Sequence, residues 1–291
     1  IMIGSVIRSV PFRVISGFFV GLFSVIQAEP LRVVSQTVGT DELLLAVAAP
    51  EQIAALSHIA REKEYSAVAD KAVNYAQIGR GDAETILKFR PDLVLVADYS
   101  RGELVSQLKR AGVELMSFDQ YATMDDALEN LRRLARRLGP DAEVRAADVI
   151  ADVEQRMTNL AERLEGVRSV KVIAPSTYGI ISGGGTTFQD LCNRAAAENL
   201  AMTVGELTGH ADIPRERMLT WPVERVVLAG YDLEQTIKPF LTLIPFRFME
   251  AVKERRVALI EPYMFGSVTH YRLDGYEQLA RQLHPERFEE D

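Results

Sequence analysis

The sequence predicts an α/β protein built from two Rossmann-like lobes that one long helix joins. Short β-branched segments alternate with helical patterns on both sides of residues 140–166, which is typical of α/β units. The run from Leu93 to Ala97 is continuously apolar, as expected of a strand buried on both faces of a parallel sheet. We therefore expect an N-terminal lobe at 31–122, connecting helices at 123–166 and a C-terminal lobe at 167–285.

The long connecting helix is predicted from a single apolar stripe. Gly139 and Pro140 favour a helix start, and Gly166 favours a helix end. At about 1.5 Å per residue, a helix of this length can join two lobes. A long surface helix on a single domain is the alternative. The stripe consists of Ile150, Val153, Met157, Leu160, Ala161 and Leu164.

Residues 1–28 have the composition of an export signal. Arg8 and Arg13 precede an apolar run at 14–26, and Ala28 supplies a small residue at the expected cleavage site. The run is shorter than the roughly 20 apolar residues that a membrane-spanning helix needs. We expect an exported chain that is cleaved after Ala28.

The cysteine content predicts where the protein resides in the cell, and its net charge excludes some classes of partner. Cys192, the one cysteine of the sequence, lies in an apolar helical pattern, so we expect it in the core rather than at a redox site. No cysteine follows the apolar run to take a lipid anchor, which predicts a free protein in the periplasm. The net charge of −8 argues against nucleic acid or an anionic membrane as the main partner.

The first lobe opens with a strand, a polar turn and a helix. Residues 31–35 include the β-branched Val33 and Val34 and are expected to form a short strand, and Thr40 with two following acidic residues introduces an apolar helix. The turn lies at the carboxyl end of the strand, where open α/β sheets bind their ligands. Thr37, Gly39 and Thr40 are therefore candidate ligand-binding residues, with ordinary helix capping as the alternative for each.

The rest of the first lobe includes one long polar loop at 57–74, which carries His58 and Tyr65. Loops of this length inside compact domains are often functional. Tyr99 follows the buried strand at its carboxyl end. The expected elements are strands at 52–56, 93–97 and 113–118 and helices at 81–89, 101–111 and 124–138.

The second lobe repeats this arrangement. A strand at 170–174 precedes Tyr178 and a glycine-rich turn at 182–187, which opens a helix at 188–197. The turn lacks the spacing and the lysine of phosphate-binding fingerprints, so we expect Gly184 and Thr186 to bring the backbone close to a bound molecule. A short helix from 214, strands at 226–228 and 256–260, and a helix at 269–283 complete the lobe; Tyr231 and Tyr263 follow the two strands.

Four stretches together resemble the periplasmic binding proteins of ABC importers for ferric siderophores, haem and cobalamin. Residues 32–47 are similar to the family's strand, S-x-x-P-x-x-T-E and helix, but Val38 replaces proline and Asp41 replaces threonine. Residues 81–95 resemble G-x-x-E-x-I-L-x-x-x-P-D-L-V-L. Residues 182–188 resemble the glycine-threonine-phenylalanine turn, and 197–199 the G-x-N ending with Ala197 for glycine. The resemblance covers residues 31–285.

This resemblance implies that the chain captures a metal chelate between its lobes and delivers it to an ABC permease and its ATPase. It implies no catalysis and no cofactor of the chain's own, and we expect a monomer. Glu84 and Glu216, each near the start of a short helix before a buried strand, would dock on permease arginines by charge-assisted hydrogen bonds. Favourable charge at a helix end is the alternative for both.

Aromatic side chains dominate the loops that are expected to face the ligand, and they suit a large flat chelate. Because only Arg61, Arg80 and Arg247 add positive charge, a corrinoid or haem is favoured over a highly anionic ferric siderophore. The expected ligand-binding residues are Thr37, Gly39, Thr40, His58, Tyr65, Tyr99, Tyr178, Gly184, Thr186, Phe188, Tyr231 and Tyr263.

Two other functions compete with chelate binding. A bare zinc or manganese ion could be bound if histidines from different loops converged, although His58, His210, His270 and His284 show no H-x-x-x-H pairing. An exported two-lobed enzyme is the second alternative. The sequence has no nucleophile elbow, no paired metal carboxylates and no cofactor fingerprint to support it.

Overall fold

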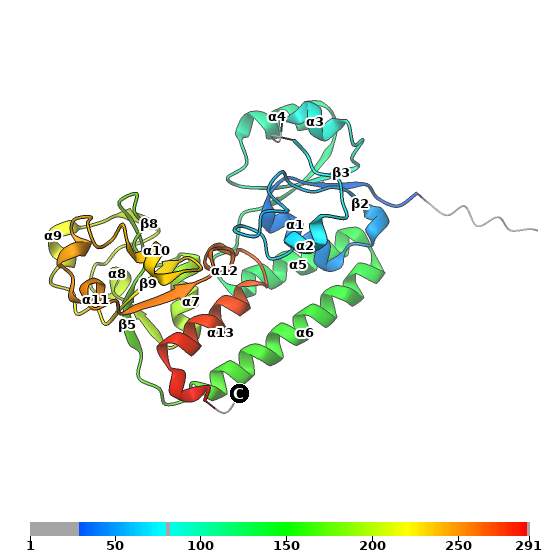
Figure 1. Ribbon diagram of the computed structural model, residues 1–291. Helices are drawn as coiled ribbons and strands as arrows, with labels where there is room; N and C mark the ends of the chain where they lie inside the picture. Colours follow the sequence, from blue (N-terminus) through cyan, green and yellow to red (C-terminus); the bar gives the residue numbers. More distant parts are fainter. Residues whose placement is uncertain (1–28, 80–81, 290–291) are drawn as a thin grey trace, which may run out of the picture. The chain divides into compact units, whose positions relative to one another are not determined.

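Two parallel β-sheets of four strands each organise the chain. The computed structural model describes residues 29–79 and 82–289, and within them the strand order is β2-β1-β3-β4 in one sheet and β10-β9-β5-β7 in the other (Figure 1). Neighbouring strands in both sheets are parallel. Parallel strands need crossover connections, which the intervening helices supply.

The first half of the chain builds the first sheet and the two long helices that follow it. Its strands are β1 (Val33–Ser35), β2 (Ile53–Ala55), β3 (Leu93–Ala97) and β4 (Glu114–Phe118). Its helices are α1 (Val38–Val47), η1 (Pro50–Gln52), α2 (Ala69–Ala72), α3 (Ala83–Leu87), α4 (Gly102–Arg110), α5 (Met124–Leu138) and α6 (Pro140–Arg163).

The second half builds the second sheet and a small antiparallel ribbon. Its strands are β5 (Val170–Ile173), β6 (Ile180–Ser182), β7 (Ala197–Asn199), β8 (His210–Asp212), β9 (Arg225–Ala229) and β10 (Val257–Ile260), with β6 and β8 forming the ribbon. Its helices are α7 (Thr187–Arg194), α8 (Leu200–Thr203), α9 (Arg215–Met218), α10 (Leu233–Ile237), η2 (Phe246–Phe248), α11 (Glu250–Lys253), α12 (Pro262–Gly266), α13 (Arg272–Leu283) and η3 (Pro285–Arg287).

The central strands β3 and β9 pack against apolar side chains on both faces, which explains their continuous apolar runs. The neighbouring residues Leu93 and Val94 of β3 lie in different cores, and so do Val226 and Val227 of β9. This follows because successive strand residues point to opposite faces. Leu93 and Val227 belong to the same cluster, which we call the shared core because it touches both sheets.

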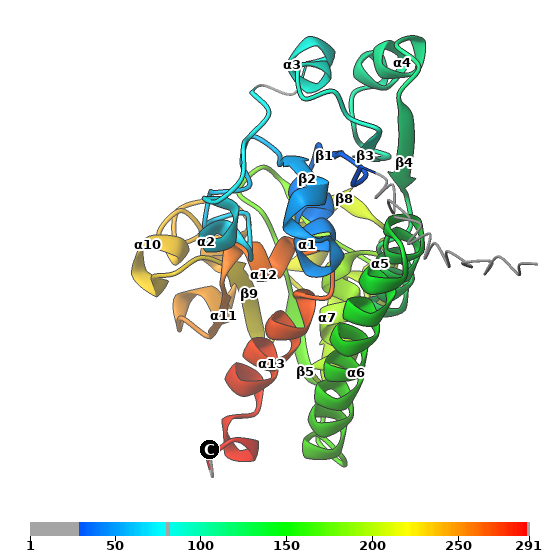
Figure 2. The ribbon, with the colours of Figure 1, turned by 90° about the vertical axis from the view of Figure 1, so that its right-hand side faces the viewer.

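Three long helices complete the shared core. Helix α6 contributes Val153 and Leu160, and α13 contributes Leu279, all at most 5% exposed. Helix α6 packs against both α5 and α13 (Figures 1 and 2). Of the apolar stripe that predicted a connecting helix, Ile150, Val153, Leu160 and Leu164 are buried in this core, Met157 is half-buried and Ala161 is exposed.

The junction between α5 and α6 is set by two residues. Gly139 ends α5 with a φ of 116°, a conformation that favours glycine, and Pro140 occupies the first turn of α6. At the other end of α5, Thr123 and Asp126 form a reciprocal capping box. The expected helix starts at 124 and 140 agree with both helices, and Gly139 and Pro140 were the signals that predicted the second.

Several short strands differ from the expectation. The helix expected at 188–197 ends earlier, at Arg194, and residues 197–199 form β7 beside β5. The β6–β8 ribbon was not expected. Each of these strands has three residues, too few for a periodic pattern.

The expected signal segment lies outside the described residues, and the expected lobe boundaries stay predictions. Within residues 29–79 and 82–289, no helix is both long and apolar enough to cross a membrane.

Replacing Leu279 by alanine tests the shared core. The side chain is fully buried, so its loss should lower the free energy of unfolding by about 2–5 kcal/mol in a urea titration. Val144 on α6 is 63% exposed and serves as the control, because Val144→Ala should change stability by less than about 0.5 kcal/mol. Equal effects of the two substitutions would show that α13 is not held by this core.

Candidate functional site

A cavity of about 380 Å³ lies at the carboxyl ends of β1 and β3, next to loops of the second half. These adjacent strands are where the strand order of the first sheet reverses direction, the position at which open α/β sheets bind ligands. The volume falls within the range of small-molecule sites. The lining consists of residues 36–39, Glu42, His58, Ile59, Tyr65, 99–101, Pro262, Tyr263 and 266–268.

The first turn of α1 forms one side of the cavity. The Thr37 hydroxyl accepts a hydrogen bond from the N–H of Thr40 at 3.2 Å, so Thr37 caps the helix and also lines the cavity. Gly39 gives Val268 room to approach, since a Cβ on Gly39 would lie 2.5 Å from Val268 Cγ2. The loop at 266–268 therefore lies directly against the start of α1.

Glu42 connects two sides of the cavity. Its Oε1 accepts a hydrogen bond from the N–H of Ala67 at 3.1 Å, and its Oε2 accepts one from the Thr269 hydroxyl at 2.5 Å. Ala67 belongs to the long loop that carries His58, and Thr269 directly follows the lining residues 266–268. One buried carboxyl thus links α1 to a loop of each half.

Burial dominates the electrostatics of Glu42 and its neighbour Asp41. Removal from water raises the pKa of each carboxyl to about 7, although hydrogen bonds to the charged forms oppose the shift. For Asp41, the opposing bonds include the N–H and the hydroxyl of Ser57, at 2.9 and 2.5 Å. Below pH 7, the Glu42 carboxyl in the cavity lining is therefore mostly neutral.

Tyr65, Tyr99 and Tyr263 bring three phenol rings into the lining from separate segments. Tyr99 meets Tyr121 edge to face, with 6.1 Å between ring centroids. Burial raises the pKa of Tyr99, and burial together with the nearby Glu261 carboxylate raises that of Tyr263 to about 12. Tyr99 and Tyr263 therefore stay protonated at neutral pH and can donate hydrogen bonds to a ligand.

Tyr231 lies beside this cavity rather than in it. It lines a neighbouring hollow of about 330 Å³, which shares Tyr263 with the main cavity. Its hydroxyl donates to the backbone carbonyl of Lys63 at 3.2 Å. The loop that carries Tyr65 is therefore bonded to the second half of the chain.

The four histidines lie in separate surroundings. His58 lines the cavity, His210 lies on the β6–β8 ribbon, and His284 Nε2 lies 3.1 Å from a backbone carbonyl oxygen. His270 is buried, which lowers its pKa to about 4. Within residues 29–79 and 82–289, no three His, Cys, Asp or Glu side chains are placed to hold a metal ion. The geometry of this part of the chain gives the bare-ion alternative no support.

Several expected ligand-binding residues lie away from the cavity. Thr40 is buried, and its hydroxyl is 2.7 Å from that of Ser35. Phe188 is 1% exposed and stacks on Phe265 in the shared core, so the expectation that it faces a ligand is corrected. Its aromatic ring packs inward because it lies on the buried face of α7. Tyr178 is 91% exposed at the turn before β6.

The glycine-rich turn contacts another backbone segment instead of the cavity. A Cβ on Gly183 would lie 2.4 Å from the Leu207 carbonyl oxygen, and the N–H of Gly184 donates to that same oxygen at 2.9 Å. Thr186 caps α7 by accepting a hydrogen bond from the N–H of Gln189. The glycines permit close packing of the chain on itself, and the expected approach of Gly184 and Thr186 to a bound molecule stays a prediction.

Positive charge in the lining comes from an arginine that was not expected there, Arg101. Arg61 donates to the carbonyl of Tyr75 at 2.6 Å, Arg247 stacks on a phenylalanine ring, and Arg80 lies outside the described residues. Arg101 follows β3 closely, so the rule that ligands bind at strand ends could have found it. No local pattern marked Glu42 or Val268 as lining residues.

The two candidate docking residues are exposed in different halves. Glu84 lies in the first turn of α3 with its side chain 84% exposed, and it pairs with Lys88 at 3.1 Å. Glu216 is exposed in α9, shortly before β9 (Figure 1). Each glutamate therefore lies on a short helix that precedes a sheet strand.

Residues 33–264 match the model of the periplasmic binding protein family. The chain belongs to this family. This confirms the family that the sequence motifs predicted, and the two sheets around α6 agree with the two-lobed fold of similar structures. The proteins it resembles are binding proteins rather than enzymes.

Three similar proteins illustrate the relationship. The uncharacterized ABC transporter substrate-binding lipoprotein YvrC of Bacillus subtilis is 20% identical over 278 residues, which cover 91% of this binding protein and 83% of YvrC. A cobalamin-binding protein of Halobacterium salinarum is 23% identical over 160 residues, 53% of this chain but only 42% of that protein. The apo structure of the periplasmic heme-binding protein RhuT from Roseiflexus sp. RS-1 has a TM-score of 0.73 at 18% identity, over 87% of this chain and 99% of RhuT.

Glu42→Gln should change how the stability of this binding protein depends on pH. The folded pKa of about 7 exceeds the ordinary value of 4.5, so the folded state keeps a proton that the unfolded chain releases. The retained proton adds to the free energy of unfolding. This stabilisation is complete below pH 4.5 and is lost as the pH rises through 7, by at most about 1.4 kcal/mol per pH unit. Urea titrations from pH 4.5 to 8 should therefore show wild type losing stability relative to the variant.

His270 titrates in both proteins, so its effect cancels in this comparison. Asp41 also titrates in both, but its pKa is raised slightly less in the variant, because the charge of Glu42 is the smallest of the causes that raise it. The lowered pKa of His270 acts in the opposite sense, with stability lost as the pH falls toward 4. Parallel stability curves for wild type and Glu42→Gln would contradict the raised pKa of Glu42.

Proposed function

We propose that this binding protein captures a metal chelate, a haem or a corrinoid in preference to a ferric siderophore, in the cavity beside α1. The observation that carries the proposal is the convergence of Tyr65, Tyr99 and Tyr263 with His58 at the strand-order reversal of the first sheet. The chelate is cargo, and the chain needs no cofactor of its own.

The chemistry of the lining fits a flat, metal-bearing ligand. Aromatic rings pack well on a conjugated macrocycle. The imidazole of His58 can supply an axial ligand to its metal, a role that histidine and tyrosine both fill in haem proteins. The phenols of Tyr99 and Tyr263 can donate hydrogen bonds to acceptors on its edge.

The charge of the lining supports a ligand that is not strongly anionic. Among the described residues of the lining, Arg101 is the one arginine and Glu42 is the one carboxylic acid. A ligand with several negative charges would meet too few cations to balance them. The cavity is also smaller than a whole tetrapyrrole, so part of such a ligand would extend toward the hollow beside Tyr231.

The names of similar proteins support the same ligand class and a transport role. One relative is named as a cobalamin-binding protein, one similar structure as a heme-binding protein, and one relative as part of an ABC transporter. We propose that an ABC permease and its ATPase receive the chelate, with Glu84 and Glu216 contacting basic groups of the permease. We also propose export by residues 1–28 and a monomeric mature protein in the periplasm.

Ligand titration tests the binding proposal. Purified protein from residue 29 onward is titrated with hemin, cyanocobalamin, a ferric siderophore and Zn²⁺, and binding is followed by tyrosine and tryptophan fluorescence. We expect saturable binding of hemin or cyanocobalamin at one molecule per chain. Tyr99→Ala should weaken it at least tenfold, since the ring lines the cavity.

Tyr178→Ala is the matched control, because this tyrosine is exposed outside the cavity and its loss should change affinity less than twofold. Binding of Zn²⁺ alone would contradict chelate capture. Equal losses in the two variants would place the ligand elsewhere.

The docking proposal is tested with Glu84→Ala combined with Glu216→Ala. Loss of both carboxylates should abolish importer-dependent uptake of the bound chelate in proteoliposomes while affinity stays unchanged, because neither residue lines the cavity. Glu103 and Glu234 lie in the first turns of α4 and α10 and give a matched double-alanine control. Lost affinity in the first variant, or equal uptake by both, would refute the docking role.

A further inference from the structure

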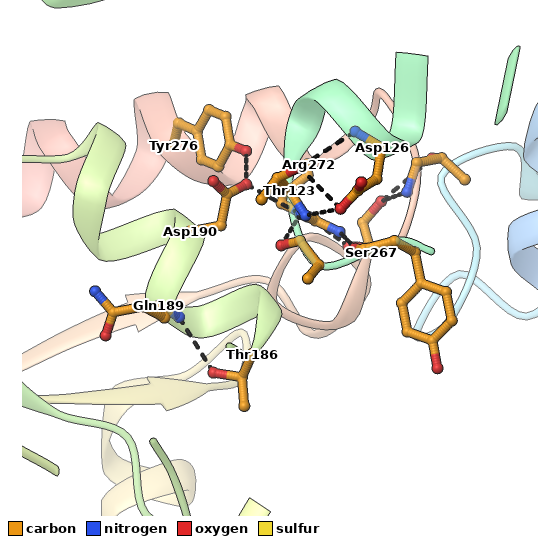
Figure 3. Close-up of polar contacts among 11 residues, drawn as sticks. Thr123, Asp126, Thr186, Gln189, Asp190, Ser267, Arg272 and Tyr276 are labelled. Carbon is orange, nitrogen blue, oxygen red and sulfur yellow. Dashed lines mark hydrogen bonds and ion pairs between the residues drawn. The ribbon is translucent and has the colours of Figure 1, made fainter. Parts of the chain in front are cut away.

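Arg272, the first residue of α13, is a fully buried cation. Its Nε donates to the carbonyl of Ser267 at 2.8 Å, and Nη1 donates to the carboxylate of Asp190 at 3.0 Å (Figure 3). Nη1 and Nη2 also donate to the carbonyls of Ala122 and Tyr121, at 2.9 and 2.6 Å. One side chain therefore bonds to segments from both halves of the chain.

Asp190 makes the burial of this charge possible. Its carboxylate lies on α7, is 6% exposed, and also accepts a hydrogen bond from the Tyr276 hydroxyl (Figure 3). A buried cation without a counter-ion would be strongly destabilising. We refer to Arg272, Asp190 and Tyr276 as the Arg272 clamp.

The carbonyls bound by the clamp belong to two sides of the ligand cavity. Ser267 is itself a lining residue, and Val268 next to it packs on Gly39. Tyr121 reaches the cavity indirectly, because its ring contacts the lining residue Tyr99. The Tyr121 hydroxyl also donates to Asp98 at 3.1 Å, which orients the ring.

Arg272 itself is absent from the lining of the cavity. Its effect on a ligand must therefore pass through the segments it holds. Three donor contacts restrict the two segments and a fourth binds Asp190, all in fixed directions, because the guanidinium is planar and its donors diverge. Loss of these contacts would let the loop at 266–268 and the ring of Tyr99 move apart.

We propose that Arg272 is a positioning residue for ligand binding, which sets the spacing between the loop at 266–268 and Tyr99 without touching the ligand. The proposal rests on the proposed chelate site. It assigns a function to a buried ion pair that lies outside the cavity.

The test compares Arg272→Gln with Arg156→Gln. Arg156 on α6 also binds two carboxylates, Asp274 and Glu277 of α13, but its hydrogen bonds go to neither cavity segment. Dissociation of hemin or cyanocobalamin is measured by stopped flow after competition. We expect Arg272→Gln to dissociate at least tenfold faster than wild type and Arg156→Gln to stay within twofold.

A second variant and a ligand-free measurement complete the test. Tyr276→Phe keeps the ring and the Arg272–Asp190 pair, so it should fold normally and dissociate two- to fivefold faster than wild type. Amide hydrogen exchange without ligand should speed up at residues 119–123 and 266–269 in Arg272→Gln and not in Arg156→Gln. If wild type binds neither chelate, the proposed function is refuted, but hydrogen exchange without ligand still tests the positioning role of Arg272. Unchanged exchange at both segments, or equal dissociation rates in the two arginine variants, would overturn the positioning role.

Discussion

The packing of both sheets onto one apolar core is the constraint on which the rest of the structure depends. Val153 and Leu160 of α6 and Leu279 of α13 lie in the same cluster as strand residues from each half. A cluster of this kind cannot be divided without exposing apolar surface to water. The two halves are therefore held at a fixed separation, and the loops at their strand ends meet where the cavity forms.

Polar groups buried beside the cavity, at the edge of that core, are hydrogen-bonded to its loops. Parallel strands place their following loops at one end of each sheet, which brings residues after β1 and β3 together. Polar groups buried there are paired, as in the bonds of Glu42 to Ala67 and Thr269. Pairing of this kind offsets the cost of burial and fixes the loops that would contact a ligand.

Local signals in the sequence were sufficient for most of the long elements. The apolar run that became β3 and the Gly139–Pro140 pair at the start of α6 each specify an element through neighbours in the chain. The same reasoning placed Thr37 and Tyr99 at the cavity, because both follow strands of the first sheet. The alternation of strands and helices on both sides of residues 140–166 predicted two lobes, and the order of the family motifs agreed with that arrangement.

Distant partners explain what the sequence could not predict. Glu42 bonds to Thr269 across 227 positions, and Arg272 bonds to Tyr121 across 151, so no local pattern marks either side chain. Phe188 illustrates a second limit. An aromatic residue after a glycine-rich turn is equally compatible with a ligand contact and with a core position, and only the packing of α7 distinguishes them.

The most direct test of this account is a crystal structure of the protein soaked with hemin or cyanocobalamin, in which anomalous scattering locates the iron or cobalt. The account predicts a single metal position bordered by His58, Tyr99 and Tyr263, in the cavity beside α1. A metal found against the glycine-rich turn at 182–187, or on the α6 face between Asp148 and His270, would contradict it.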